Sequence, residues 1–214
     1  MRQETSAGPL RETAVAVAFV LLWASCFALG RVLHNPTVVL AGLCAVALVV
    51  YRHKVVPLLR PARTGTIASV LQGLTVGVAT VAVTHLLWPL VGELIPAWRT
   101  EHRALVSLLG SSTLIVPLVA FVAAAEELLF RGVLYDVLLS RFGHPRRAAV
   151  LTCALYALAQ VGSGATLVVL AAVGLGSVWL WLRITTGRLL PSAVAHACWT
   201  LSTLFVWPVP NGPG

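Results

Sequence analysis

Long apolar segments recur along the whole chain, separated by short polar connections and by breaks at proline and glycine. A transmembrane helix needs about 20 mainly apolar residues, and this pattern leaves no room for a soluble domain. We therefore predict an all-α, polytopic transmembrane helix bundle of about seven spans, in one domain covering residues 13–207. The predicted spans are Thr13–Gly30, Pro36–Tyr51, Thr64–Val91, Ser112–Leu139, Ala148–Val161, Ala165–Ile184 and Leu189–Trp207.

The remaining segments are polar or rich in helix breakers. Residues 1–12 are predicted to form a polar cytoplasmic tail, and residues 208–214, with their prolines and glycines, a flexible one. Residues 52–63 form the most basic connection and residues 92–103 a polar loop, while residues 104–110 read as a short interfacial or re-entrant piece.

Composition and charge support a membrane protein. The chain is 58% hydrophobic and only 10% charged, whereas soluble domains carry about 25% charged residues. Its net charge is +8, but the basic residues are scattered over short connections, which argues against nucleic-acid binding. With the N-terminus inside, eleven basic residues fall in inner segments and three in outer loops. This bias predicts a multi-pass protein of the cell membrane, in contact with membrane lipids, with a cytoplasmic N-terminus and an external C-terminus.

The four cysteines lie within apolar segments and form no C-x-x-C pair. We read Cys26, Cys44, Cys153 and Cys198 as buried small hydrophobic residues, and expect neither a disulfide framework nor a zinc-thiolate site.

Three ionisable residues stand inside the predicted fourth span. They are Glu126, Glu127 and Arg131, and ionisable groups at such depth are costly and usually functional. Glu127 and Arg131 have the i, i+4 spacing of a helical ion pair, whereas Glu126 points about 100° away from Glu127. One carboxylate can thus be structural and the other chemical. The alternative is a buried polar cluster that only holds helices together.

Two further spans offer polar pairs at i, i+4 spacing, each on one helical face. These are Tyr156 with Gln160, and His196 with Thr200. Counted from the cytoplasmic ends of their spans, Glu126 and Gln160 lie roughly 20 Å deep and His196 roughly 12 Å, at about 1.5 Å per residue. We predict a polar cavity between spans four, five and seven that opens toward the cytoplasm.

The sequence Glu126-Glu127-Leu128-Leu129-Phe130-Arg131 resembles the first motif, E-E-x-x-x-R, of the CPBP intramembrane proteases, the group of CAAX-prenyl proteases and bacteriocin-processing or immunity proteins. The resemblance covers roughly residues 112–205. Two departures from the family pattern stand out. Gln160 occupies the histidine position of the second motif, F-x-x-x-H, and Thr200 the asparagine or aspartate position of the third, H-x-x-x-N or D.

The resemblance implies a hydrolase that acts on a peptide or protein substrate at the membrane. In that mechanism Glu126 activates a water, with Glu127 and Arg131 in support, and His196, Gln160 and Thr200 polarise the carbonyl or orient the water. A catalytic zinc usually takes three protein ligands, and Gln160 is not a normal one. Only Glu126, His196 and, as an alternative third ligand, Glu127 remain as candidate metal ligands, which weakens a zinc-dependent mechanism more than a glutamate-water mechanism.

Three functional hypotheses remain. The first is an intramembrane endopeptidase; the second is an inactive relative that binds or scaffolds a membrane partner, with the motif kept for folding. The third is a small transporter or proton relay that uses Glu126, against which stands the lack of internal duplication. His85, in the third span, is predicted to be structural or cavity-lining, with the alternative that it replaces the missing histidine.

Overall fold

The computed structural model describes residues 7–59, 65–109 and 115–209, and in these ranges it contains helices and no strand. The α-helices are α1 (Ala7–Val32), α2 (Pro36–Val50), α3 (Arg52–Leu59), α4 (Thr66–Leu94), α5 (Pro96–Leu109), α6 (Ile115–Glu126), α7 (Tyr135–Phe142), α8 (Pro145–Gln160), α9 (Thr166–Thr186) and α10 (Leu190–Leu201). Two π-helical segments, η1 (Glu127–Leu134) and η3 (Ser202–Val206), and one short 3₁₀ segment, η2 (Val161–Ser163), complete them. The predicted all-α fold is confirmed.

Within the described residues, two helices, α4 and α9, are long and apolar enough to cross a membrane. Helices α2 and α3 add a third if that pair, bent by 89°, is counted as one span. Shorter apolar helices cover Val17–Val32 and Leu190–Val206. The chain therefore carries membrane-type helices, while the number of seven spans stays a prediction. The predicted fourth span is not one continuous α-helix, because a π-helical segment divides it into α6, η1 and α7.

Several predicted boundaries are wrong. Helix α1 begins at Ala7, inside the predicted tail 1–12, of which residues 1–6 lie outside the described residues. The basic connection contains helix α3, and most of the predicted loop 92–103 belongs to α5. Helix α5 is amphipathic. The loop was predicted from the average polarity of the segment, which does not reveal that polar and apolar residues lie on opposite faces of a helix. Of the predicted flexible tail, the structure describes only residues 208 and 209, which have no regular secondary structure.

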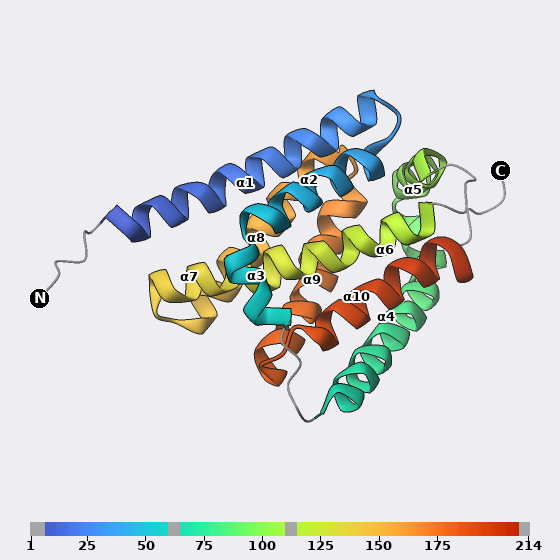
Figure 1. The fold of residues 1–214 in the computed structure, drawn as a ribbon. Coiled ribbons are helices and arrows are strands. Elements are labelled where there is room, and N and C mark those ends of the chain that lie inside the picture. Colours follow the sequence, from blue (N-terminus) through green and yellow to red (C-terminus); the bar gives the residue numbers. More distant parts are fainter. Residues whose placement is uncertain (1–6, 60–64, 110–114, 210–214) are drawn as a thin grey trace, which may run out of the picture.

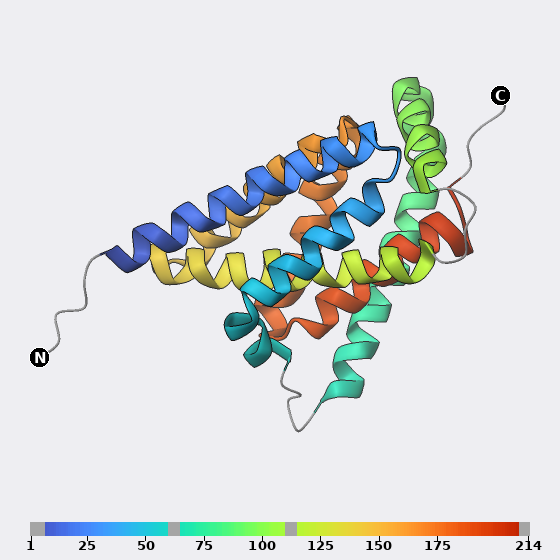
Figure 2. The same ribbon diagram turned by 45° about the horizontal axis from the view of Figure 1, so that its top comes forward.

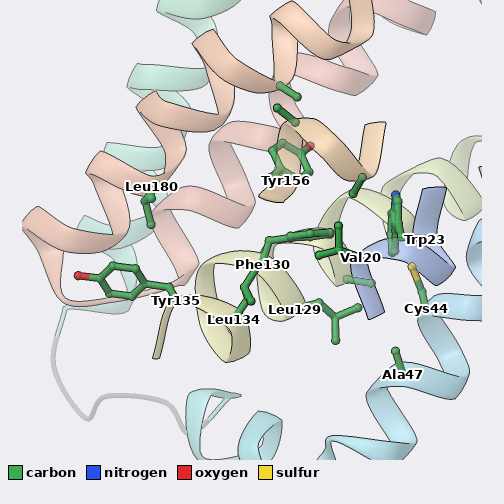
Figure 3. Packing of buried hydrophobic residues seen from close by; sticks show 14 of the residues in the cluster. Val20, Trp23, Cys44, Ala47, Leu129, Phe130, Leu134, Tyr135, Tyr156 and Leu180 are labelled. Atoms are coloured by element: carbon green, nitrogen blue, oxygen red, sulfur yellow. The ribbon is translucent and has the colours of Figure 1, made fainter. Parts of the chain in front are cut away.

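Helices α6, η1 and α7 follow one another without a break and run as one long rod through the molecule (Figure 1; Figure 2). Phe130 of η1 is fully buried and lies between two other aromatic side chains (Figure 3). Its ring centroid is 5.4 Å from that of Trp23 on α1 and 4.9 Å from that of Tyr156 on α8, both in edge-on contact. This aromatic core fixes the rotation of η1 about its axis.

Helix α10 packs closely along α4 because two glycines remove the side chains between them (Figure 1). A Cβ atom added at Gly73 would lie 2.6 Å from the carbonyl oxygen of Pro191, and one added at Gly77 would lie 2.7 Å from Cβ of Cys198. Such distances leave no room for a side chain. These small residues let the two helix backbones approach, which sets the position of α10.

Candidate active site

Glu127 is fully buried, and its carboxylate is held by side chains from η1 and α10. Its Oε1 lies 3.1 Å from Nη1 of Arg131 and 2.9 Å from Nδ1 of His196. Its Oε2 accepts a hydrogen bond from the hydroxyl of Ser192. Both oxygens are engaged, so this carboxylate has the environment of a structural anchor. The predicted i, i+4 ion pair with Arg131 is confirmed.

Glu126, the last residue of α6, has a different set of partners. Its Oε2 accepts a hydrogen bond of 2.8 Å from the Tyr156 hydroxyl, and its Oε1 one of 3.2 Å from Nε2 of Gln160. The Oε2 atom also lies 3.7 Å from Nε2 of His196. Glu126 is 7% exposed and lines a cavity. The two neighbouring carboxylates therefore face different partners.

His196 lies between the two carboxylates, with one ring nitrogen toward each. Its ring stacks on the indole of Trp179 from α9, with ring centroids 3.9 Å apart and planes at 15°. When Nδ1 donates to Glu127, Nε2 is an acceptor in the neutral ring and a donor in the protonated ring. Stacking and the Nδ1 contact together fix where Nε2 lies relative to Glu126.

Arg131 is also held by aromatic contacts. Its guanidinium carbon lies 3.9 Å from the centroid of the Tyr156 ring and 5.6 Å from that of Trp179. A glycine on α9 makes room for this arrangement, since a Cβ atom at Gly176 would lie 2.7 Å from Nη2 of Arg131 and 3.0 Å from Cδ1 of Tyr156. The cation thus joins η1, α8 and α9 around Glu127.

A cavity of about 580 Å³ adjoins this cluster. The predicted site residues that line it are Glu126, Gln160, His196 and Thr200. Most of its other lining residues are apolar, and α2, α4, α5 and α9 contribute to it as well. The predicted polar cavity between three spans is therefore not confirmed in that form.

The structure brings most of the predicted residues together. Glu126, Glu127, Arg131, Gln160 and His196 form one network of contacts. No hydrogen bond joins Thr200 to it among the residues described, although Thr200 lines the same cavity.

His85 does not take the place of the missing histidine. Its Nδ1 lies 3.0 Å from the carbonyl oxygen of Val81, and its Nε2 lies 2.9 Å from that of Trp207. Its ring also stacks on the indole of Trp207, with centroids 4.0 Å apart. Of its two predicted roles, the structural one agrees with these contacts.

Two site residues were missed from the sequence, Ser192 and Trp179. Ser192 stands four residues before His196 on α10, so the same i, i+4 rule that paired His196 with Thr200 could have found it. Trp179 carried no comparable signal, because its contact with His196 depends on how α9 packs against α10.

The residues present do not match a catalytic zinc site. Within the described ranges, no group of three or more histidine, cysteine, aspartate or glutamate side chains could hold a metal ion. Glu127, the nearest third carboxylate or imidazole donor, is engaged by Arg131 and Ser192. The four cysteines are free, and the prediction that all of them are buried holds for Cys44 only, because Cys26, Cys153 and Cys198 are partly exposed.

Comparison with protein families identifies a match to part of the chain. Residues 108–202 match the family model of the Rce1-like type II CAAX prenyl endopeptidases. This match supports the resemblance to the CPBP/CAAX proteases over residues 108–202. The matched region spans less than half of the 214 residues but contains every predicted site residue, from Glu126 to Thr200. No curated protein and no solved structure matches the chain.

Proposed function

We propose that this chain is an intramembrane endopeptidase that hydrolyses a peptide bond of a membrane-associated protein or peptide. The observation that carries the proposal is that the two adjacent glutamates have different partners. Glu127 is engaged by Arg131, Ser192 and His196, whereas Glu126 lines the cavity beside His196 and Gln160. A buried carboxylate at a cavity, next to polarising groups, has the position of a general base.

In the proposed reaction, Glu126 takes a proton from a water as the water oxygen bonds to the carbonyl carbon. A carboxylate offers about four lone-pair positions, so the bonds from Tyr156 and Gln160 leave room for that water. The carbonyl oxygen becomes an oxyanion, which the second N–H of Gln160 and a protonated His196 stabilise. The carbon–nitrogen bond then breaks as Glu126 passes its proton to the leaving amine, and a carboxylic acid and an amine result.

The test is cleavage of a peptide library by the purified protein in nanodiscs. We expect Glu126→Gln to lose cleavage while keeping its expression and melting temperature, because the amide accepts no proton at neutral pH. Glu93→Gln is the matched control, since Glu93 is exposed on α4 and does not line the cavity. Cleavage by Glu126→Gln at the wild-type rate would refute the assignment of Glu126.

The same assay with a metal chelator added tests whether cleavage requires zinc. We expect cleavage to persist after chelation, because Gln160 leaves too few ligands for a catalytic zinc. Loss of cleavage on chelation, with recovery on adding zinc, would assign Glu126 and His196 as metal ligands.

Gln160 also favours the second hypothesis, an inactive relative that binds a membrane partner. In that case no peptide would be cleaved by a folded wild-type protein, and Glu126→Gln would retain partner binding. Uptake by proteoliposomes tests the transporter or proton-relay hypothesis.

For the membrane, we propose a multi-pass protein of the cell membrane with the N-terminus in the cytoplasm and the C-terminus outside. The distribution of basic residues supports this orientation. Labelling of single cysteines introduced near either end with a membrane-impermeant reagent tests it, and equal labelling from the outside at both ends would contradict it.

A further inference from the structure

Two buried hydrogen-bond donor atoms have no acceptor among the described residues, although the residues that carry them line the cavity. They are Nε1 of Trp179, a residue only 2% exposed, and Oγ1 of Thr200. A buried donor without a partner costs about 1–3 kcal/mol, and native proteins contain few of them. Such groups call for an explanation, above all at a cavity.

Both donors flank His196. The Trp179 ring stacks on that histidine, with centroids 3.9 Å apart, and Thr200 follows it by one turn of α10. His196 in turn lies 3.7 Å from Glu126 through its Nε2. The donors are thus grouped around the proposed general base and its neighbour.

The neighbouring tryptophans show that the Trp179 donor is unusual at this cavity. Trp199 also lines the cavity, but its Nε1 donates to Oγ1 of Thr84 at 2.9 Å. Trp23 has an unpaired Nε1 as well, yet it lies in the aromatic core and does not line the cavity. Of these three tryptophans, Trp179 combines burial, a missing acceptor among the described residues and a place at the cavity.

We propose that Trp179 and Thr200 bind the backbone of the substrate, with the indole N–H and the hydroxyl donating to peptide carbonyl oxygens. This inference rests on the proposed function. A peptide segment inside an apolar cavity cannot satisfy its carbonyl groups with water, so the protein must supply donors. An indole N–H only donates, which suits a carbonyl oxygen and excludes an N–H group of the substrate.

Conservative variants separate this role from a structural one. Trp179→Phe keeps an aromatic ring against His196 but removes the N–H, and Thr200→Val removes the hydroxyl at nearly constant volume. Binding is measured as the anisotropy of a fluorescein-labelled pool of blocked, apolar decapeptides in a Glu126→Gln background, which does not require cleavage. We expect each variant to raise Kd about three- to tenfold, the range of one hydrogen bond, and Thr200→Ser to restore binding.

Melting temperature gives a second, independent readout. Because neither donor has an acceptor among the described residues, Trp179→Phe and Thr200→Val should melt no lower than the parent. Trp199→Phe is the matched control and should melt lower, because it breaks the bond to Thr84. Unchanged Kd in both variants, or no binding of the pool by the parent, would overturn the inference. If cleavage fails but the Kd changes appear, only the proposed catalysis is refuted.

Discussion

Replacing Arg131 should reveal how strongly the buried ion pair holds the site together. Arg131→Met fills similar space but removes the cation, leaving the Glu127 carboxylate buried with only Ser192 and His196 as partners. Removing one partner of a buried pair costs about 3–5 kcal/mol, because the remaining charge is uncompensated. The same logic applies to Glu127→Gln, which leaves the guanidinium buried.

The double variant Arg131→Met/Glu127→Gln removes both charges and should recover much of this loss. What remains missing is the contact of the cation with the Tyr156 ring at 3.9 Å, worth about 2 kcal/mol when desolvated. Two single losses of about 3–5 kcal/mol each, against a loss of about 2 kcal/mol in the double variant, make the double variant more stable than the sum of the single effects by about 4 kcal/mol or more.

The assay is reversible unfolding by sodium dodecyl sulfate in mixed micelles, which gives the free energy of unfolding for each variant. Arg146→Gln serves as the control, because Arg146 is exposed on α8 and its replacement should stay within about 0.5 kcal/mol of wild type. Additive single effects, with no recovery in the double variant, would refute the energetic coupling inferred from the 3.1 Å contact between Glu127 and Arg131.

Two further predictions concern packing around α9. Gly176→Ala should lower the free energy of unfolding by about 1–3 kcal/mol, because the added methyl group would lie 2.7 Å from Nη2 of Arg131. Gly174→Ala is the control: nothing lies within 4 Å of its Cβ, so it should be neutral or stabilise α9 by up to about 1 kcal/mol. Equal effects of the two variants in the same assay would contradict the close approach at Gly176. Glu101→Gln should lower the free energy of unfolding by about 1 kcal/mol, because the Glu101 carboxylate accepts a 2.9 Å hydrogen bond from the backbone N–H of Leu167 at the start of α9. A melting temperature equal to that of wild type would contradict this capping role.

The close approach of the site side chains could be predicted, because it follows from helical spacing and from depth along the spans. The i, i+4 spacing paired Glu127 with Arg131, and counting residues along the spans put Glu126 and Gln160 at similar depth. His196 was counted about 8 Å shallower at 1.5 Å per residue, yet it contacts both glutamates. Depth counted from sequence assumes upright, parallel spans, which this fold does not have (Figure 2).

The parts that could not be predicted depend on how helices rotate and pack. Trp179 contacts His196 only because α9 turns that face toward α10, and the sequence near Trp179 records no such preference. Helix α5 was mistaken for a loop, although Trp98, His102 and Leu105 recur at helical spacing and all line the cavity. The polar residues on its other face made the segment polar on average, which led to the prediction of a loop.

The π segment gives a physical reason for the separate environments of two adjacent glutamates. Glu126 closes the α-helical part of the rod, so its direction follows the packing of α6, while Glu127 opens η1, whose wider turn changes the direction of the following side chains. Such segments are uncommon and tend to occur at functional sites. Here η1 is held by Phe130 in the aromatic core and by Leu58 of α3, which fits against Gly132 because a Cβ there would lie 2.6 Å from Cδ1 of Leu58. Tyr156 connects this core to the carboxylates, because its ring contacts Phe130 and Arg131 while its hydroxyl donates to Glu126.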